Sequence, residues 1–388
     1  MALWLWSVAV LVSWSGARGL EVGPQRHVWT SPAGLGSIDA LRLVPARAVA
    51  PRGDDDVRVR VRAIGLNFAD VFSVLGLYSA ASEADAASRA ADEPFACGLE
   101  FAGVVVDAGP TSGFQAGDRV FGFTRFGAFA DEVVQRGALL RPSPEGWTDA
   151  EAASILVQGM TAWYALVTLG GAKEGSRVLV HSAAGGVGLL ALEICRARGC
   201  RALAVVSSEA KAALIRDRFG EGVATVVRGR APTREYRATL DAFGAFDVVL
   251  ESLGGAWLTE ALDRVAPMGR LVHFGATASY GSAANGWLKW PGLVWAFLQR
   301  PMIDVGSLTS TNRGVFGFNL IWLTENEAML AECLEQMLRG GVANRTPLIG
   351  KTFAFAQLPD ALRHLKSGTS TGKVVVLVGD DPCKDAAS

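Results

Sequence analysis

The stretch Val178-Leu-Val-His-Ser-Ala-Ala-Gly-Gly-Val-Gly-Leu-Leu-Ala-Leu192 decides the fold of this chain. Its first half has the apolar run of a buried strand, and residues 186–198 have the spacing of a helix that ends at Gly199. The glycines align with the pattern G-x-G-x-x-G on positions 183, 185 and 188, with Ala183 in the first place. Glycine is needed where the backbone approaches a pyrophosphate, and a helix start supplies free N–H groups.

The pattern therefore predicts a dinucleotide-binding loop, and a tight turn without a ligand is the alternative. The residues predicted to form this loop are Ala184, Gly185, Gly186, Val187 and Gly188.

Strands and helices alternate on the carboxyl side of this loop. Apolar runs at 202–206, 224–227, 247–250 and 270–274 are separated by helical runs at 209–219, 234–243 and 257–264. Such alternation predicts an α/β fold with a doubly wound parallel sheet of the Rossmann type over residues 158–342. A ligand of such a sheet binds at the carboxyl ends of its strands.

Short β-type runs flank this unit on both sides. Residues 57–63 alternate apolar and basic side chains, and further strands are predicted at 351–355 and 373–378. The dinucleotide domain is therefore expected to be inserted into a β-rich domain made of residues 26–157 and 343–388. The Ala-, Ser- and acid-rich residues 79–92 are predicted to form an exposed loop.

Composition excludes two classes of protein. Half of the 388 residues are hydrophobic, which excludes a disordered chain. The 37 basic and 38 acidic residues give a net charge of −1, which leaves no basic surface for a nucleic-acid partner. The five cysteines are odd in number and form no C-x-x-C pair, so we expect free thiols.

Residues 1–25 precede the predicted domains. Residues 2–12 are apolar and are followed by small residues, as in a signal peptide, but no Lys or Arg comes before them. The segment is a targeting leader or an unstructured extension. A leader predicts an organelle or the secretory pathway, and otherwise the cytoplasm is expected.

The second strand of the dinucleotide domain indicates which cofactor the loop binds. An NAD site has a carboxylate at the end of this strand, whereas this strand ends in Ser207 and Ser208, with Lys211 one turn later. Hydroxyls and a cation suit a ribose 2′-phosphate, and Arg228 adds a second cation. Glu209 is a carboxylate close to this strand end and would favour NAD, unless it only stabilises the start of the following helix as an acidic residue in its first turn. NADPH is therefore the predicted cofactor.

Motifs along the chain resemble one superfamily. They are Gly65-Leu-Asn-Phe-Ala-Asp-Val-Phe72, Gly98-Leu-Glu-Phe-Ala-Gly-Val-Val105, Ala116-Gly-Asp-Arg-Val-Phe121, Gln158-Gly-Met-Thr-Ala-Trp-Tyr164 and the glycine loop. In this order they are similar to the medium-chain dehydrogenase/reductase superfamily, within its zinc-free quinone oxidoreductase branch, which includes zeta-crystallin and VAT-1-like proteins. The resemblance implies a GroES-like β-rich domain, a Rossmann domain, NADPH, a homodimer, and reduction of quinones or α,β-unsaturated carbonyls.

The resemblance also implies site residues. Asn67 matches the position whose amide faces nicotinamide or substrate. Tyr78 matches a tyrosine near the substrate, and Thr161 matches a position near the nicotinamide. For each of the three, a structural hydrogen bond or helix cap is the alternative. The residues that match cofactor or pocket positions are Leu253, Leu308, Phe274, Gly275, Gly372 and Lys373, with core packing as the alternative for the two leucines.

The resemblance also indicates whether this chain has the zinc ligands of its metal-binding relatives. Zinc-bearing relatives have a cysteine near the position of Asn67 and a Gly-His-Glu block, whereas this chain has Gly98-Leu99-Glu100. No metal site is therefore predicted. Without a Lewis acid, the expected acceptors are a quinone or an enone, whose conjugation spreads the developing charge.

Other functions stay open on the sequence. One is an NADPH-binding VAT-1-like scaffold or membrane-associated protein with little turnover, and another is an enoyl reductase module of a polyketide synthase. The tryptophan-rich residues 286–303 are interpreted as a pocket wall, a dimer contact or a peripheral membrane contact.

We expect Lys211→Ala to raise the Michaelis constant for NADPH and to leave that for NADH nearly unchanged, since only NADPH carries the 2′-phosphate. Loss of one hydrogen bond to a charged group costs about 1.5–3 kcal/mol, or roughly a 10- to 100-fold effect. Steady-state kinetics with both cofactors test this. Equal effects on the two would refute the NADPH assignment.

Overall fold

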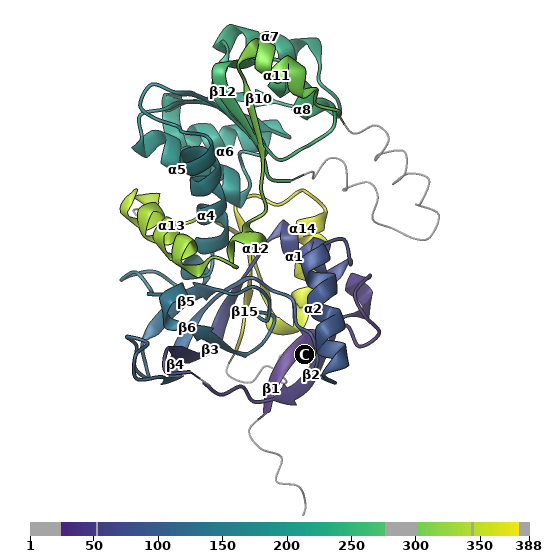
Figure 1. Ribbon diagram of the computed structural model, residues 1–388, viewed down its shortest axis with the longest axis vertical. Coiled ribbons are helices and arrows are strands. Elements are labelled where there is room, and N and C mark those ends of the chain that lie inside the picture. The colour runs from purple at the N-terminus through teal and green to yellow at the C-terminus, as the bar shows by residue number, and fades with distance from the viewer. Residues whose placement is uncertain (1–24, 52, 276–300, 343–344, 380–388) are drawn as a thin grey trace, which may run out of the picture.

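The computed structural model describes residues 25–51, 53–275, 301–342 and 345–379. Figure 1 shows two lobes, each built around a sheet, with α4 (Leu156–Trp163) and α12 (Leu320–Leu323) near their junction. The predicted leader, most of the tryptophan-rich segment and Cys383 lie outside the described residues.

The upper lobe contains a six-stranded parallel sheet in the order β10-β9-β8-β11-β12-β13. Its strands are β8 (Arg177–Val180), β9 (Arg201–Val206), β10 (Val223–Val227), β11 (Phe246–Glu251), β12 (Val265–His273) and β13 (Gly314–Gly317). The helices around it are α5 (Gly186–Ala197), α6 (Glu209–Phe219), α7 (Arg234–Phe243), α8 (Ala256–Leu262) and α11 (Val305–Thr311). The predicted Rossmann sheet is confirmed, and β13 is an additional edge strand.

Helices on both faces explain why these strands are apolar throughout. Val178, Leu179 and Val180 of β8 are all buried, although their side chains alternate between the two faces. The strand order reverses beside β8, since β9 lies on one side of it and β11 on the other. A ligand of such a sheet binds at this point, outside the carboxyl ends of the strands.

The lower lobe contains a seven-stranded sheet in the order β14-β15-β3-β4-β5-β7, with β6 also paired to β3. Its strands are β3 (Asp56–Leu66), β4 (Glu100–Ala108), β5 (Arg119–Phe123), β6 (Glu132–Arg136), β7 (Leu140–Pro142), β14 (Ile349–Ala354) and β15 (Lys373–Leu377); β1 (Gln25–Thr30) and β2 (Arg42–Arg47) pair separately. Strand β15 lies between β14 and β3. The last part of the chain is therefore an integral part of the lower sheet, whose strands β3 to β7 come from the first part.

The remaining helices pack on the lower sheet or between the lobes. They are α1 (Phe68–Val74), α2 (Ser79–Ala90), α3 (Asp149–Ala152), α13 (Glu327–Arg339) and α14 (Leu358–Lys366), with short 3₁₀ turns at Ile38–Ala40, Gly137–Leu139, Gly220–Gly222 and Phe355–Gln357. The loop predicted over residues 79–92 is wrong, because α2 occupies most of it. Alanine is the best helix former, and Ala80 and Ala81 are buried against the lobe.

A change of helix type follows α4. The chain stays helical after Trp163, but from Tyr164 to Leu169 it is a π-helix, a form frequent at functional sites. Together, Asp149–Leu169 are long and apolar enough to cross a membrane, yet 72% of that apolar window is buried inside the protein. A helix that is buried to this extent is typical of a protein core, and core helices can be as long and apolar as membrane spans.

Gly103 of β4 permits the close approach of β3. A Cβ at this position would lie 2.0 Å from the carbonyl oxygen of Arg60. We expect Gly103→Ala to lower the free energy of unfolding by about 3 kcal/mol, since the two paired strands must move apart. The matched control is Gly222→Ala, where a Cβ would meet no atom within 4 Å. Urea denaturation measures both, and equal midpoints would contradict the prediction.

Candidate functional site

The glycine loop joins β8 to α5. Ser182 turns the chain with a φ of 53°, and Gly185 precedes α5 without a side chain to cap it. The N–H groups at the start of α5 therefore remain available to a ligand.

Each glycine of the loop has its own steric reason. A Cβ on Gly186 would lie 1.7 Å from Oε1 of Gln158, and a Cβ on Gly188 would lie 2.5 Å from the Cα of Ala183. A Cβ on Gly185 would meet only the Ser182 oxygen, at 3.3 Å. The glycines thus allow close packing at Gly186 and Gly188 and leave open space at the Cα of Gly185, which a pyrophosphate can approach.

The second cofactor element gathers at the carboxyl ends of β9 and β10. Arg228 N–H donates to the Val206 carbonyl at 2.8 Å, which places Arg228 beside Ser207 and Ser208. Burial lowers the pKa of Lys211, and the nearby positive charge of Arg228 lowers it further. Two cations held this close favour an anionic partner, so these residues fit a ribose 2′-phosphate.

Three side chains in this region have roles that the sequence left open. The Ser208 hydroxyl accepts from Lys211 N–H at 3.3 Å, so Ser208 is the N-cap of α6. Glu209 is exposed and pairs with Arg216 at 3.4 Å, which accounts for it as a first-turn acid. The guanidinium of Arg228 lies 5.6 Å over the ring of Trp257.

The end of the chain returns to the glycine loop. Gly372 N–H donates to the carbonyl of Ala184 at 2.9 Å and forms a parallel bridge with Gly185. Gly372 has a φ of 59°, and a Cβ there would lie 2.3 Å from the Leu348 carbonyl oxygen. Nearby, Lys211 Nζ donates to the carbonyl of Gly368 at 3.1 Å. Two hydrogen bonds thus connect the lobes at the predicted cofactor site.

A buried polar cluster follows directly from this bridge. Lys373 is 1% exposed and donates from Nζ to Asn67 Oδ1 at 2.9 Å and to Glu100. Asn67 Nδ2 donates to Glu100 Oε1 at 3.0 Å and to the Gly65 carbonyl at 3.3 Å, and Glu100 Oε2 accepts from Val157 N–H at 3.1 Å. Both hydrogens of the Asn67 amide are therefore in use.

This arrangement gives Asn67 the structural hydrogen bonds that were the alternative to its predicted role toward nicotinamide or substrate. An amide with both N–H groups bonded inside the protein has no donor left for a developing oxyanion. Asn67 instead links Lys373 to Glu100 and begins α1, where its backbone N–H donates to Asp70 at 2.7 Å.

Asp70 completes the cluster as a buried carboxyl. It is fully buried, and its Oδ1 has no hydrogen-bond partner. Burial raises the pKa of Asp70 to about 7, despite the hydrogen bond from Asn67 and the nearby charge of Lys373.

Tyr78 lies where the lobes meet. Its hydroxyl donates to Asn319 Oδ1 at 2.5 Å, and Asn319 is the N-cap of α12. Burial raises the pKa of Tyr78 to about 12, although the bond to Asn319 opposes this. The phenol therefore keeps its proton at neutral pH. Asn319 was not predicted as a site residue, because its pairing with Tyr78 spans 241 residues.

The other predicted residues divide between junction and core. The Thr161 hydroxyl donates to the Val157 carbonyl at 2.6 Å. This is the structural hydrogen bond that was the alternative to a role near the nicotinamide. Phe274 and Gly275 follow β12, and the Phe274 ring lies 6.2 Å from that of Phe318, the neighbour of Asn319. Leu253 is fully buried in the core, so core packing is its role.

Leu308 is also away from the junction. It belongs to α11, which lies beside α7 and α8 at the far end of the upper lobe (Figure 1). The predicted place for it in a pocket floor is therefore wrong.

Sequence reasoning also missed the buried carboxylate of Glu251. Glu251, at the end of β11, accepts from His273 at 2.5 Å and from His181 at 3.2 Å, and also from the N–H groups of Leu253 and Gly254. Burial alone would raise the pKa of Glu251, but the histidine contacts outweigh it and lower the pKa to about 2. These contacts fix the turn after β11 beside the glycine loop.

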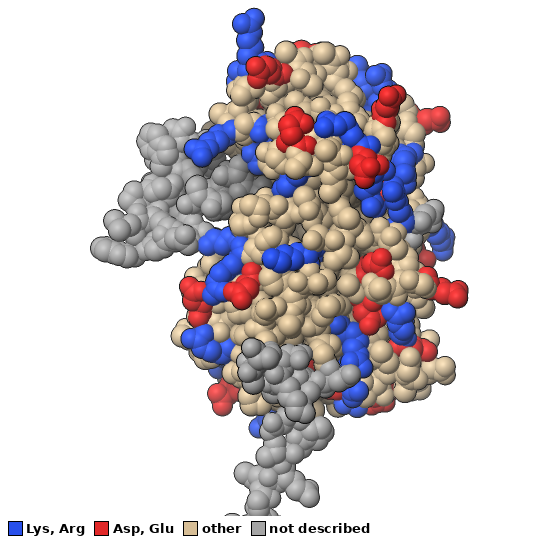
Figure 2. All heavy atoms as spheres, turned by 180° about the vertical axis from the view of Figure 1, so that it is seen from behind, with Lys and Arg blue, Asp and Glu red and all other residues tan. Residues whose placement is uncertain are grey.

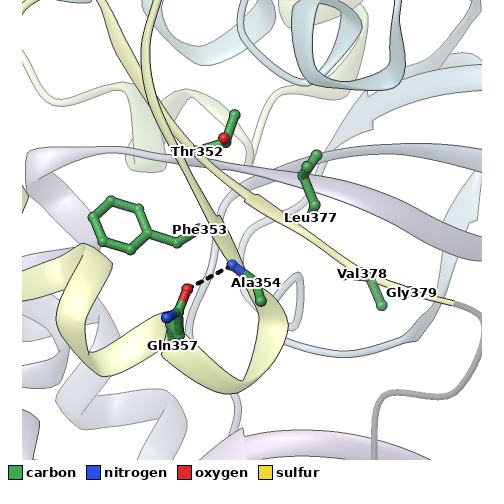
Figure 3. Close-up of a pocket in the computed structure, with 7 residues that line it drawn as sticks. All are labelled: Thr352, Phe353, Ala354, Gln357, Leu377, Val378 and Gly379. Atoms are coloured by element: carbon green, nitrogen blue, oxygen red, sulfur yellow. Dashed lines mark hydrogen bonds between the residues drawn. The ribbon is translucent and has the colours of Figure 1, made fainter. Parts of the chain in front are cut away.

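Within the described residues, no three His, Cys, Asp or Glu side chains gather as metal ligands. A shallow pocket of about 380 Å³ lies elsewhere, at the far end of β15 from Lys373. Figure 3 shows its lining, which has no charged side chain: Thr352, Phe353, Ala354, Gln357, Leu377, Val378 and Gly379. Figure 2 shows acidic and basic side chains interspersed over one face.

Two family models match the chain. Residues 53–168 match the alcohol dehydrogenase GroES-like domain, and residues 222–376 match zinc-binding dehydrogenase. The chain is 30% identical over 353 residues to the synaptic vesicle membrane protein VAT-1 homolog of Rattus norvegicus, covering 90% of this chain and 83% of that protein. The chain belongs to the medium-chain dehydrogenase/reductase superfamily, an oxidoreductase family, in its zinc-free quinone oxidoreductase branch.

Another relative is much longer. The spectinabilin polyketide synthase system protein NorB of Streptomyces orinoci is 34% identical over 372 residues, which cover 93% of this chain but 15% of NorB. Among solved structures, a quinone oxidoreductase of Pseudomonas syringae pv. Tomato DC3000 has a TM-score of 0.71 at 27% identity, covering 91% of this chain and 100% of that chain. A mycobacterial protein complexed with NADPH shares the fold, with a TM-score of 0.73 at 23% identity and the same coverage.

Asp70 makes stability depend on pH. Its pKa of about 7 lies above the value of about 3.9 in an unfolded chain, so the folded chain holds the extra proton between these values. This stabilisation is present below about pH 4 and is lost as the pH rises through 7. We expect the free energy of unfolding of Asp70→Asn, relative to wild type, to rise by up to roughly 4 kcal/mol from pH 4 to pH 8.

Urea unfolding at a series of pH values measures the difference. The matched control is Asp263→Asn, at an exposed carboxyl after α8, which should follow the wild-type curve. A constant difference between Asp70→Asn and wild type across this range would contradict a protonated Asp70.

Proposed function

We propose that this protein uses NADPH to reduce a quinone or an α,β-unsaturated carbonyl by hydride transfer, without a metal. The observation that carries the proposal is that three elements lie along the lobe junction. These are the glycine loop with open space at the Gly185 Cα, the neighbouring cations Lys211 and Arg228, and the protonated phenol of Tyr78.

The residues of the upper lobe account for binding NADPH. The N–H groups at the start of α5 and the open space at the Gly185 Cα suit the pyrophosphate. Lys211 and Arg228, with Ser207 beside them, suit the 2′-phosphate. When bound, NADPH supplies the hydride.

The kinetic test of Lys211→Ala has a charge-matched control. Lys351→Ala also removes one lysine, but Lys351 lies on β14 in the other lobe.

The residues at the junction account for the acceptor. Phe274, Phe318 and Tyr164 form a run of aromatic rings with centroids 5.2 and 6.2 Å apart, which offers an apolar surface to a planar conjugated molecule. Asn319 is adjacent to Phe318 in the chain, so the Tyr78 hydroxyl lies next to this surface.

Tyr78 is the proposed proton donor. Its raised pKa keeps it protonated, and its bond to Asn319 lies near the surface, where a substrate oxygen can compete for it. Asn67, Lys373 and Glu100 act as positioning residues, because their polar atoms already bond to one another. A quinone or an enone suits a reaction without a metal, because its own conjugation delocalises the developing negative charge.

We expect the purified chain to oxidise NADPH in the presence of some member of a panel of quinones and enones, followed by stopped-flow loss of NADPH absorbance. Tyr78→Phe removes only the phenolic proton, so kcat is expected to fall by about 100-fold while the Michaelis constant for NADPH is retained.

Tyr164→Phe is the matched control, since the ring contact with Phe318 is kept. Full activity of Tyr78→Phe would remove Tyr78 as the donor. NADPH binding without turnover of any acceptor would overturn the reductase proposal and favour a cofactor-binding scaffold.

A further inference from the structure

The carboxyl end of α5 carries two cysteines in a defined cap. Gly199 has a φ of 68°, its N–H donates to the Arg196 carbonyl at 3.2 Å, and Cys200 N–H donates to the Cys195 carbonyl at 2.8 Å. These two bonds make up a Schellman motif. The motif brings together the side chains of the residues that its longer bond joins, here Cys195 and Cys200.

The two cysteines are neighbours in this cap and differ in exposure. The Cys200 thiol donates to the Lys173 carbonyl at 3.3 Å, and the Cys200 side chain packs against the core cluster that contains Cys195. Cys195 is 1% exposed, whereas Cys200 is half-buried. One sulfur is therefore reachable from solvent, and the second is buried in the same cap, whose backbone bond joins the two residues.

Their surroundings separate this pair from the other described cysteines. The hydrogen bond from Cys195 lowers the pKa of the Cys200 thiol, and the charge of Arg198 lowers it further against the effect of burial. Burial raises the pKa values of Cys97 and Cys333. The thiolate is the reactive form of cysteine, so Cys200 is the nucleophile of the set.

We propose that Cys195 and Cys200 form a redox-active dithiol that hydrogen peroxide converts to a disulfide. The Cys200 thiolate attacks one peroxide oxygen, the O–O bond breaks, and a sulfenic acid and hydroxide form. The Cys195 sulfur then attacks the sulfenic sulfur, the S–S bond forms, and the hydroxyl leaves as water with the Cys195 proton. Two thiols and one peroxide give one disulfide and two waters, and an external dithiol reverses the reaction.

The disulfide would close the turn between α5 and β9. This turn is at the opposite end of α5 from the glycine loop and at the opposite end of β9 from Ser207. Oxidation is therefore expected to leave NADPH binding unchanged. The proposal goes beyond the proposed reductase activity and does not depend on it.

The test uses the full chain in a Cys383→Ser background, since Cys383 lies outside the described residues. After brief treatment with peroxide, we expect the intact mass to fall by two hydrogen atoms. Trypsin cleaves after arginine, and Arg196 and Arg198 lie between the cysteines. Digestion without reductant should therefore yield peptide 178–196 joined to the tripeptide 199–201, and dithiothreitol should separate them.

Variants identify the order of attack. With Cys195→Ser, the sulfenic acid on Cys200 should persist and be trapped by dimedone, and with Cys200→Ser no linked peptide should form. Cys333→Ser is the matched control and should form the disulfide normally. In the untreated protein, iodoacetamide should modify Cys200 at least about tenfold faster than Cys97. Unlinked peptides after treatment, or Cys200 joined to another cysteine, would overturn the proposal.

Discussion

The hydrogen bond from Gly372 N–H to the carbonyl of Ala184 is the constraint on which the rest of the site depends. It joins the first residues of β15 to the turn before α5 and so connects the two lobes through backbone atoms. The next residue, Lys373, is thereby placed in the interior, where an unpaired charge would be costly. Glu100 and Asn67 pair with it, and this pairing sets the start of α1.

The polar groups at the junction fall into two kinds. Those of Asn67, Lys373 and Glu100 are buried and bonded to one another, so they orient the backbone at the start of α1 and β15. The bond between Tyr78 and Asn319 is nearer the surface, and a phenol can exchange one acceptor for another at little cost. The geometry thus separates the groups that hold the site in shape from the group that can exchange a proton.

Local patterns predicted the parallel sheet, the bounds of α6 and the glycine loop, because spacing along the chain determines each of them. The role of Asn67 could not be predicted in the same way. Its hydrogen bonds depend on Glu100 and Lys373, which are far away in sequence, and no local pattern encodes them. The helix over residues 79–90 was not predicted for another reason. Its serines and acidic residues are typical of an exposed loop, whereas the alanines between them favour a helix.

The position of β15 has a consequence for biosynthesis. Strand β3 leaves the ribosome early, but its neighbour β15 follows only after the whole upper lobe has been made, and Lys373 and Asn67 are 306 residues apart. The inserted lobe has its own continuous segment of chain and can fold first. Until β15 has been made, the part of β3 that pairs with it has an open edge, and such edges promote aggregation. Synthesis that stops before Lys373 therefore leaves β3 without this partner along Ala63–Leu66.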